Sequence, residues 1–132
     1  MGAWGLGVFD NDCAMDWLQE LTESSGLSAI KMALAAVIDS MDYMEVDEGS
    51  AGLAAIEIIN LLKGNGPSDT PEYVMEWVHN NEQHDVSSLI PLANSALEKI
   101  ENPETSEVSA LWLEGGYNWA GMVSDIRRRL NA

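Results

Sequence analysis

The sequence has little that would cross-link the chain or anchor it in a membrane. It contains one cysteine, Cys13, so no disulfide can form within the chain. No apolar run approaches the ~18 residues that a membrane-spanning helix needs. The first residues also lack the basic segment that opens a secretory signal. We therefore expect a protein of the cytoplasm that has no contact with membranes.

Positive charge is scarce. Six lysines and arginines stand against 22 aspartates and glutamates, which gives a formal net charge of −16. Such a surface repels nucleic acid and anionic lipid, and it attracts basic proteins and divalent cations. Half of the basic residues form one run, Arg127, Arg128 and Arg129, near the end of the last predicted helix. There we expect them to complement the helix dipole and to pair with acids.

Motifs for known chemistries are missing as well. The chain has no G-x-S-x-G, no phosphate-binding P-loop, no C-x-x-C and no H-E-x-x-H. His79 and His84 have no cysteine near them in sequence, which argues against structural zinc. Cys13 falls among aspartates that raise the pKa of a thiol, so we predict a small buried cysteine. We expect no cofactor and favour a protein that is not an enzyme.

Helical periodicity is what the sequence has in abundance, and no segment alternates as a strand would. Capping residues, prolines and glycines set the boundaries of about seven helical segments. These run from residue 10, 11 or 12 to 22, then over 28–41, 50–63, 70–80, from 85 or 88 to 101, from 105 or 106 to about 115, and over 119–130. Residues 1–132 are predicted to form one all-α domain, a compact bundle of about six to seven helices.

Two predicted helices, 28–41 and 50–63, are apolar nearly all round, which places both at the centre of the bundle. The acidic stretch 42–49 between them is predicted to be a connection. Glu57 lies among isoleucines in the second of these helices, so it needs a partner or a raised pKa if its face is buried. Trp112 and Trp119 flank a Gly-Gly pair and are predicted core residues, with a shared aromatic patch as the alternative.

The first nine residues combine Trp4 and Phe9 with three glycines, a composition unlike that of a flexible tail. We predict an ordered glycine and aromatic segment that packs on the helices. Acids follow it directly and gather again after residue 44. The residues predicted to form a binding surface are Trp4, Phe9, Asp10, Asn11, Asp12, Asp16, Glu45, Asp47 and Glu57.

The opening seventeen residues, MGAWGLGVFDNDCAMDW, resemble a signature of an uncharacterised bacterial family, a domain of unknown function. Its members open with M-G-A-W-G-x-G-x-F-x-N-D-x-A-x-D-W. The resemblance continues through residues 43–47, 54–57, 111–112 and 119–130, and thus covers essentially the whole chain. It implies no activity. It implies that six acids belong to a pattern shared by the family: Asp10, Asp12, Asp16, Glu45, Asp47 and Glu57.

Two functional hypotheses of different classes follow. The first is a non-enzymatic interaction protein that docks a basic protein, by analogy with small immunity or antitoxin-type proteins. The second is a divalent-metal site, possibly hydrolytic, built from Asp10, Asp12, Glu45 and Asp47, with Glu57 as a further ligand. A structural domain without a small-molecule ligand is the third and simplest alternative.

Overall fold

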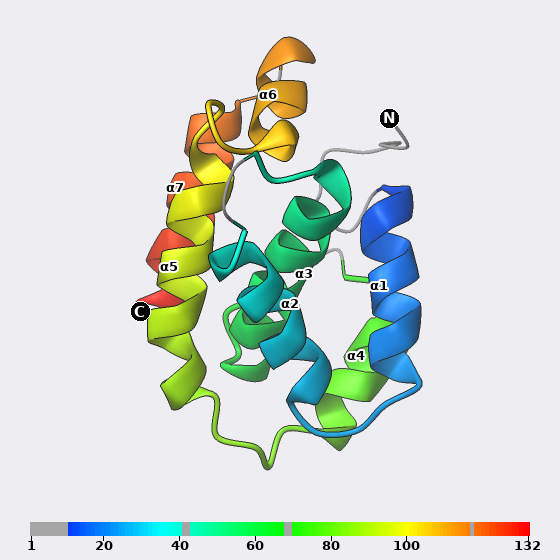
Figure 1. Ribbon diagram of the computed structural model, residues 1–132. Coiled ribbons are helices and arrows are strands. Elements are labelled where there is room, and N and C mark those ends of the chain that lie inside the picture. Colours follow the sequence, from blue (N-terminus) through cyan, green and yellow to red (C-terminus); the bar gives the residue numbers. More distant parts are fainter. Residues whose placement is uncertain (1–10, 41–42, 68–69, 117) are drawn as a thin grey trace.

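The computed structural model of the chain describes residues 11–40, 43–67, 70–116 and 118–132. Within them it contains seven α-helices and no β-strand, which confirms the all-α prediction (Figure 1). The predicted docking of Trp4 and Phe9 lies outside the described residues. The helices are α1 (Asp12–Thr22), α2 (Ser28–Ile38), α3 (Val46–Leu62), α4 (Glu72–Asn80), α5 (Ile90–Glu101), α6 (Glu107–Glu114) and α7 (Trp119–Leu130), with a short 3₁₀ turn, η1 (Ser87–Leu89), before α5.

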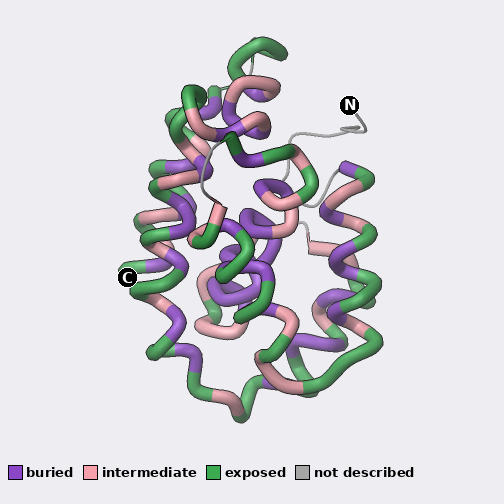
Figure 2. Tube along the Cα trace, viewed as in Figure 1, coloured by how far each residue is buried: buried purple, intermediate pink, exposed green. Residues whose placement is uncertain are grey.

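Helix α3 is the axis of the bundle, and the six other helices all pack against it (Figure 1). Helices α1 and α4 lie on one side of it, and α5 and α7 on the other. Between Gly49 and Leu61 every residue except Ala51 is buried, as the continuous buried stretch in Figure 2 shows. The prediction that this helix lies at the centre is confirmed.

Glycines on α3 let the neighbouring helices approach closely. A Cβ atom added to Gly52 would lie 2.6 Å from Cγ2 of Val37 on α2 and 3.0 Å from Cδ1 of Ile100 on α5. One added to Gly49 would lie 2.8 Å from Cγ2 of Val108 on α6. Three helices therefore pack on a surface that has no room for a methyl group.

The start of α3 differs from the prediction. The helix begins at Val46, four residues before Ser50, so much of the predicted acidic connection is helical. Asp47 and Glu48 lie in its first turn, where negative charge is favourable beside the helix dipole. The N–H of Val46 donates to Oε1 of Glu107 on α6 at 2.7 Å. This tertiary cap comes from a residue 61 positions away, so the local sequence does not reveal it.

Helix α2 differs more. The prediction placed it at the centre, but only one of its faces is buried, by Ile30, Ala33, Leu34 and Val37. Met32, Ala35 and Ala36 are exposed. Small alanine side chains make a helix apolar without requiring that it be surrounded.

The ends of α2 also differ from the prediction. The helix stops at Ile38 rather than Met41, where Lys99 donates to the carbonyl oxygens of Ile38 and Ser40. Ser28 is its first helical residue and makes no side-chain cap.

Three other helices begin with a side-chain cap at a position that the sequence offers for the helix start. Asn11 accepts from the N–H of Ala14 at 2.8 Å and begins α1. Asn118 accepts from the N–H of Gly121 and begins α7, and Ser106 caps α6 in the same way. Helix α4 begins at Glu72, two residues after the predicted start at residue 70, and Pro71 directly precedes it.

The tryptophans of the described helices belong to the core, as predicted. Trp112 and Trp119 are both buried, and their rings stack with centroids 5.8 Å apart. The indole N–H of Trp119 donates to the carbonyl of Glu101, and that of Trp77 to the carbonyl of Ser24. Both indoles are thus satisfied by backbone acceptors, which is how buried tryptophans are normally accommodated.

Within the described ranges, no helix combines the length and the apolar character needed to cross a bilayer.

Candidate functional site

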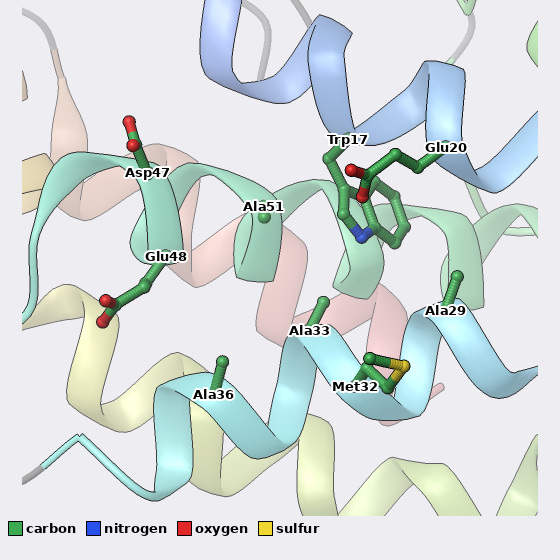
Figure 3. A pocket seen from close by; sticks show the side chains of 9 residues that line it. All are labelled: Trp17, Glu20, Ala29, Met32, Ala33, Ala36, Asp47, Glu48 and Ala51. Carbon is green, nitrogen blue, oxygen red and sulfur yellow. The ribbon is translucent and has the colours of Figure 1, made fainter.

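A shallow groove of about 310 Å³ lies where α1, α2 and α3 meet (Figure 3). We refer to it as the α1–α2–α3 groove. Two residues of α1, four of α2 and three of α3 line it. They are Trp17, Glu20, Ala29, Met32, Ala33, Ala36, Asp47, Glu48 and Ala51.

The floor of the groove is apolar because α2 and α3 face each other there with small side chains. Ala29, Ala33 and Ala36 recur on one face of α2, and Ala51 is the only residue of α3 between Gly49 and Leu61 that is not buried. The indole of Trp17 closes one side. Met32 leaves 73% of its surface exposed, the largest value among the exposed large apolar side chains. The groove is therefore an apolar surface that the described helices leave uncovered.

The rim of the groove is acidic. Glu20 lies beside Trp17, and Glu48 extends from α3 toward the end of α2 that carries Ala36 (Figure 3). Asp47 adds a third carboxylate. The groove lining thus combines three acids with apolar side chains and contains no basic residue.

Asp47 also connects the first turn of α1 to the first turn of α3. The thiol of Cys13 donates to Oδ1 of Asp47 at 2.9 Å. Burial, that hydrogen bond and the neighbouring carboxylates raise the pKa of Cys13 to about 11. The thiol is therefore protonated at neutral pH and is a poor nucleophile. It is partly rather than fully buried, a small departure from the prediction.

Of the nine predicted binding residues, Trp4, Phe9 and Asp10 lie outside the described residues. Asn11 is buried as the α1 cap. The side chains of Asp12, Asp16, Glu45 and Asp47 are exposed at the N-terminal ends of α1 and α3, and Asp47 lines the groove. The hydrogen bond between Cys13 and Asp47 shows that these two helix starts lie close together.

Glu57 lies apart from those acids. It is ten residues beyond Asp47 on the same helix, which corresponds to about 15 Å along the axis. Its two carboxylate oxygens accept from Arg129 of α7 at 2.7 and 2.9 Å. Oε1 also accepts from the amide of Asn60 at 2.9 Å. Glu57 is therefore part of a buried network that joins α3 to α7.

No three acidic, histidine or cysteine side chains of the described residues lie close enough together to hold a metal ion. His79 is near the end of α4 and pairs with Glu82 at 3.0 Å on the surface. Asp10, one of the predicted metal ligands, lies outside the described residues.

Five of the six basic side chains are held by oxygen atoms of the protein itself. Lys63 and Lys99 donate to carbonyls at the ends of α7 and α2, and the three arginines pair with carboxylates. Lys31 is exposed on α2. These five basic side chains thus bind groups of the same chain, and most of the exposed acids among the described residues form no ion pair with a cation.

The residues of α2 in the groove were not among the predicted site residues. The signal was nevertheless present in the sequence. A helix that is apolar nearly all round must either be surrounded or leave an apolar face uncovered, and α2 does the second.

Comparison with protein families matches residues 2–121 to one family, described as Domain of unknown function (DUF4259). Comparisons with curated proteins and with solved structures gave no match. The family match spans most of the helical bundle, from before α1 into the first turn of α7, and includes every residue that lines the groove. The chain therefore belongs to the DUF4259 family.

Proposed function

We propose that this protein is a non-enzymatic interaction protein that docks a basic protein partner. The observation that carries the proposal is that most of the basic side chains bind oxygen atoms of the same chain. Five of six hold carbonyl or carboxylate oxygens of the protein, while the chain carries 22 acids. These contacts offset only a few of the acids, so the net charge of −16 gives the protein a strongly negative field. Such a field accelerates encounter with a positively charged protein and disfavours acidic competitors.

The chemistry of the described groups supports binding rather than catalysis. The thiol of Cys13 has its pKa raised to about 11, so a thiolate nucleophile is scarce at neutral pH. The buried carboxylate of Glu57 is already bound by Arg129. The pairing of a small acidic helical protein with a basic target is the physical logic of immunity and antitoxin-type proteins, and the proposal shares that logic by analogy alone.

The test is capture of a partner from the source cells on the immobilised full-length chain at about 50 mM NaCl, where charge interactions are weakly screened. The expected result is a discrete basic protein that binds in a defined ratio and is released at about 500 mM NaCl. The purified partner should then bind in calorimetry with an affinity that falls as salt rises. Recovery of no basic protein, or binding that salt leaves unchanged, would contradict the proposal.

Calorimetry with Ca²⁺, Mg²⁺ and Mn²⁺ belongs in the same experiment. A saturable heat that is lost in Asp12→Asn would favour the carboxylate metal site instead. Absence of that heat, together with a salt-sensitive basic partner, is the outcome that we expect.

A further inference from the structure

The exposed face of α2 has a composition that solvation alone does not explain. Met32 and Ala36 are exposed, while Ala29 and Ala33 continue the same apolar surface into the α1–α2–α3 groove. An exposed methionine beside small apolar residues is typical of surfaces that bind an apolar side chain, since its thioether adapts to the shape of the occupant. The groove therefore has the properties of a docking surface.

The dimensions of the groove match a short helical segment. Ala29 and Ala36 are seven residues apart on α2, which is about 10 Å or two helical turns. Glu20 lies beside Trp17, and Glu48 lies nearer Ala36 (Figure 3). Carboxylates thus border an apolar floor at separate points along its length.

This inference rests on the proposed function and specifies where and how the partner binds. We propose that the α1–α2–α3 groove binds an amphipathic α-helix of the basic partner. One large apolar side chain of that helix lies over Ala33, and lysine or arginine residues one turn to either side reach the acids of the rim. This is helix-in-groove recognition, in which apolar anchors supply affinity and flanking charges set register.

Charge complementarity selects this occupant over two others. An acidic amphipathic helix would face Glu20, Asp47 and Glu48 across the rim, and like charges brought together in an interface repel each other. A second copy of this chain would bring a net charge of −16 against the same acids. A basic helix neutralises the rim while its apolar residue covers the exposed side chain of Met32.

The test uses the full-length chain and three synthetic fluorescent peptides. The first is a helix-forming peptide with a leucine or methionine at its centre and lysines or arginines one turn away on each side. The second has the same composition, but its order no longer places the apolar residue and the basic residues on one face of the helix. The third replaces the basic residues by glutamate. Fluorescence anisotropy at about 50 mM NaCl gives the affinities. We expect the first peptide to bind roughly tenfold more tightly than the second, and the third not to bind.

Two matched pairs of variants locate the site. Ala36→Leu fills the groove, whereas Ala35→Leu makes the same change at the next residue of α2, which is exposed and does not line it. Glu20→Lys reverses a rim charge, whereas Glu98→Lys makes the same reversal on the exposed surface of α5. We expect Ala36→Leu and Glu20→Lys to weaken binding of the first peptide roughly tenfold, and each control to change it less than about twofold. Circular dichroism checks that all four variants fold.

The outcomes separate this inference from the proposed function. If the second peptide binds as tightly as the first, or if Ala35→Leu and Ala36→Leu weaken binding equally, the groove is not the docking site. Capture of a salt-sensitive basic partner would then leave the proposed function standing. If light scattering shows a dimer that Ala36→Leu dissociates, a second copy is the occupant and the inference is overturned. If neither the peptides nor a basic protein bind, both proposals fail.

Discussion

Arg129 of α7 and Glu57 of α3 form a bidentate ion pair that is almost entirely removed from solvent. The N···O distances are 2.7 and 2.9 Å, and the side chain of Glu57 is only 4% exposed. The hydrogen bond to Glu57 raises the pKa of Arg129 above its ordinary value, so the guanidinium stays charged. The pair fixes the last helix of the chain to its central one.

Arg129→Met should be among the most destabilising single substitutions in this protein. It leaves the carboxylate of Glu57 buried without its cation, which typically costs about 3–5 kcal/mol. Urea unfolding followed by circular dichroism measures the loss. Arg128→Met is the matched control, because Arg128 pairs on the surface with Asp125, and exposed pairs contribute about 0–1 kcal/mol. Equal losses in the two variants would contradict the prediction. Adding Glu57→Leu to Arg129→Met should recover part of the stability, since no unpaired charge then remains in the core.

Gly52→Ala should destabilise the bundle, although alanine favours a helix over glycine by about 1 kcal/mol. The new methyl group would lie 2.6 Å from Cγ2 of Val37, which is fully buried and stiff at its first torsion angle. Overpacking of this kind costs about 1–3 kcal/mol, which offsets and exceeds the gain in propensity. The same substitution in a Val37→Ala background should cost less, because the clashing methyl is gone. Urea unfolding of the four proteins gives this coupling directly, and an undiminished cost in that background would refute the explanation.

Glu107→Ala should loosen the start of α3. The carboxylate accepts from the N–H of Val46 at 2.7 Å, and loss of a helix cap costs about 1 kcal/mol. Next to it, the N–H of Met44 donates to the carbonyl of Thr105, and the N–H of Glu107 donates to that of Met44. We therefore expect a lower thermal midpoint and faster amide hydrogen exchange at residues 46–48. Glu104→Ala, at an exposed residue before α6, is the control and should change neither measurement.

Asp47→Asn should make Cys13 more reactive. Burial is the largest cause of the raised thiol pKa, followed by the hydrogen bond to Asp47 and its charge. Removal of that charge should lower the pKa from about 11 toward 9.0, the ordinary value, without reaching it. The rate of alkylation by iodoacetamide as a function of pH gives the pKa. Glu45→Gln removes a nearby exposed carboxylate that does not perturb the thiol, so its profile should match that of the unaltered protein.

The same pKa shift has a consequence for stability. A thiol whose pKa is higher in the folded state favours folding while it is protonated. That contribution is complete below pH 9.0 and disappears as the pH rises through about 11. As the pH rises over this range, the unaltered protein should therefore lose stability relative to the Cys13→Ala variant, which has no thiol. If the difference in free energy of unfolding between the two proteins stays constant from pH 8 to 11, folding does not raise the pKa of the Cys13 thiol.

Local signals in the sequence account for most of the fold. Asn11 and Ser106 cap α1 and α6, and each is one of the alternatives that the sequence offers for that helix start; Asn118 caps α7. Such caps can be found locally because capping depends on residues only three positions apart. The start of α3 could not be predicted in this way. Its cap comes from Glu107, and Gly49 resembles a helix breaker until the contact with Val108 is known.

The candidate site was less accessible to sequence reasoning. The shared acidic pattern includes Asp47, which lines the groove at the start of α3. It also included Glu57, whose partner Arg129 is 72 residues away in sequence. Which face of an alanine-rich helix is buried depends on tertiary packing, so the exposure of Met32 and Ala36 could not be deduced from periodicity alone.

The separation in sequence between Glu57 and Arg129 also limits when, during synthesis of the chain, Glu57 can be buried with its ion-pair partner. Glu57 is made 72 residues before the guanidinium that neutralises it. At 5–20 residues per second, the nascent chain carries this carboxylate without its partner for roughly 4–14 s. Over that interval α3 cannot reach its final burial without enclosing an isolated charge. Burial of the charged Glu57 side chain is therefore expected to become favourable only after α7 has been synthesised.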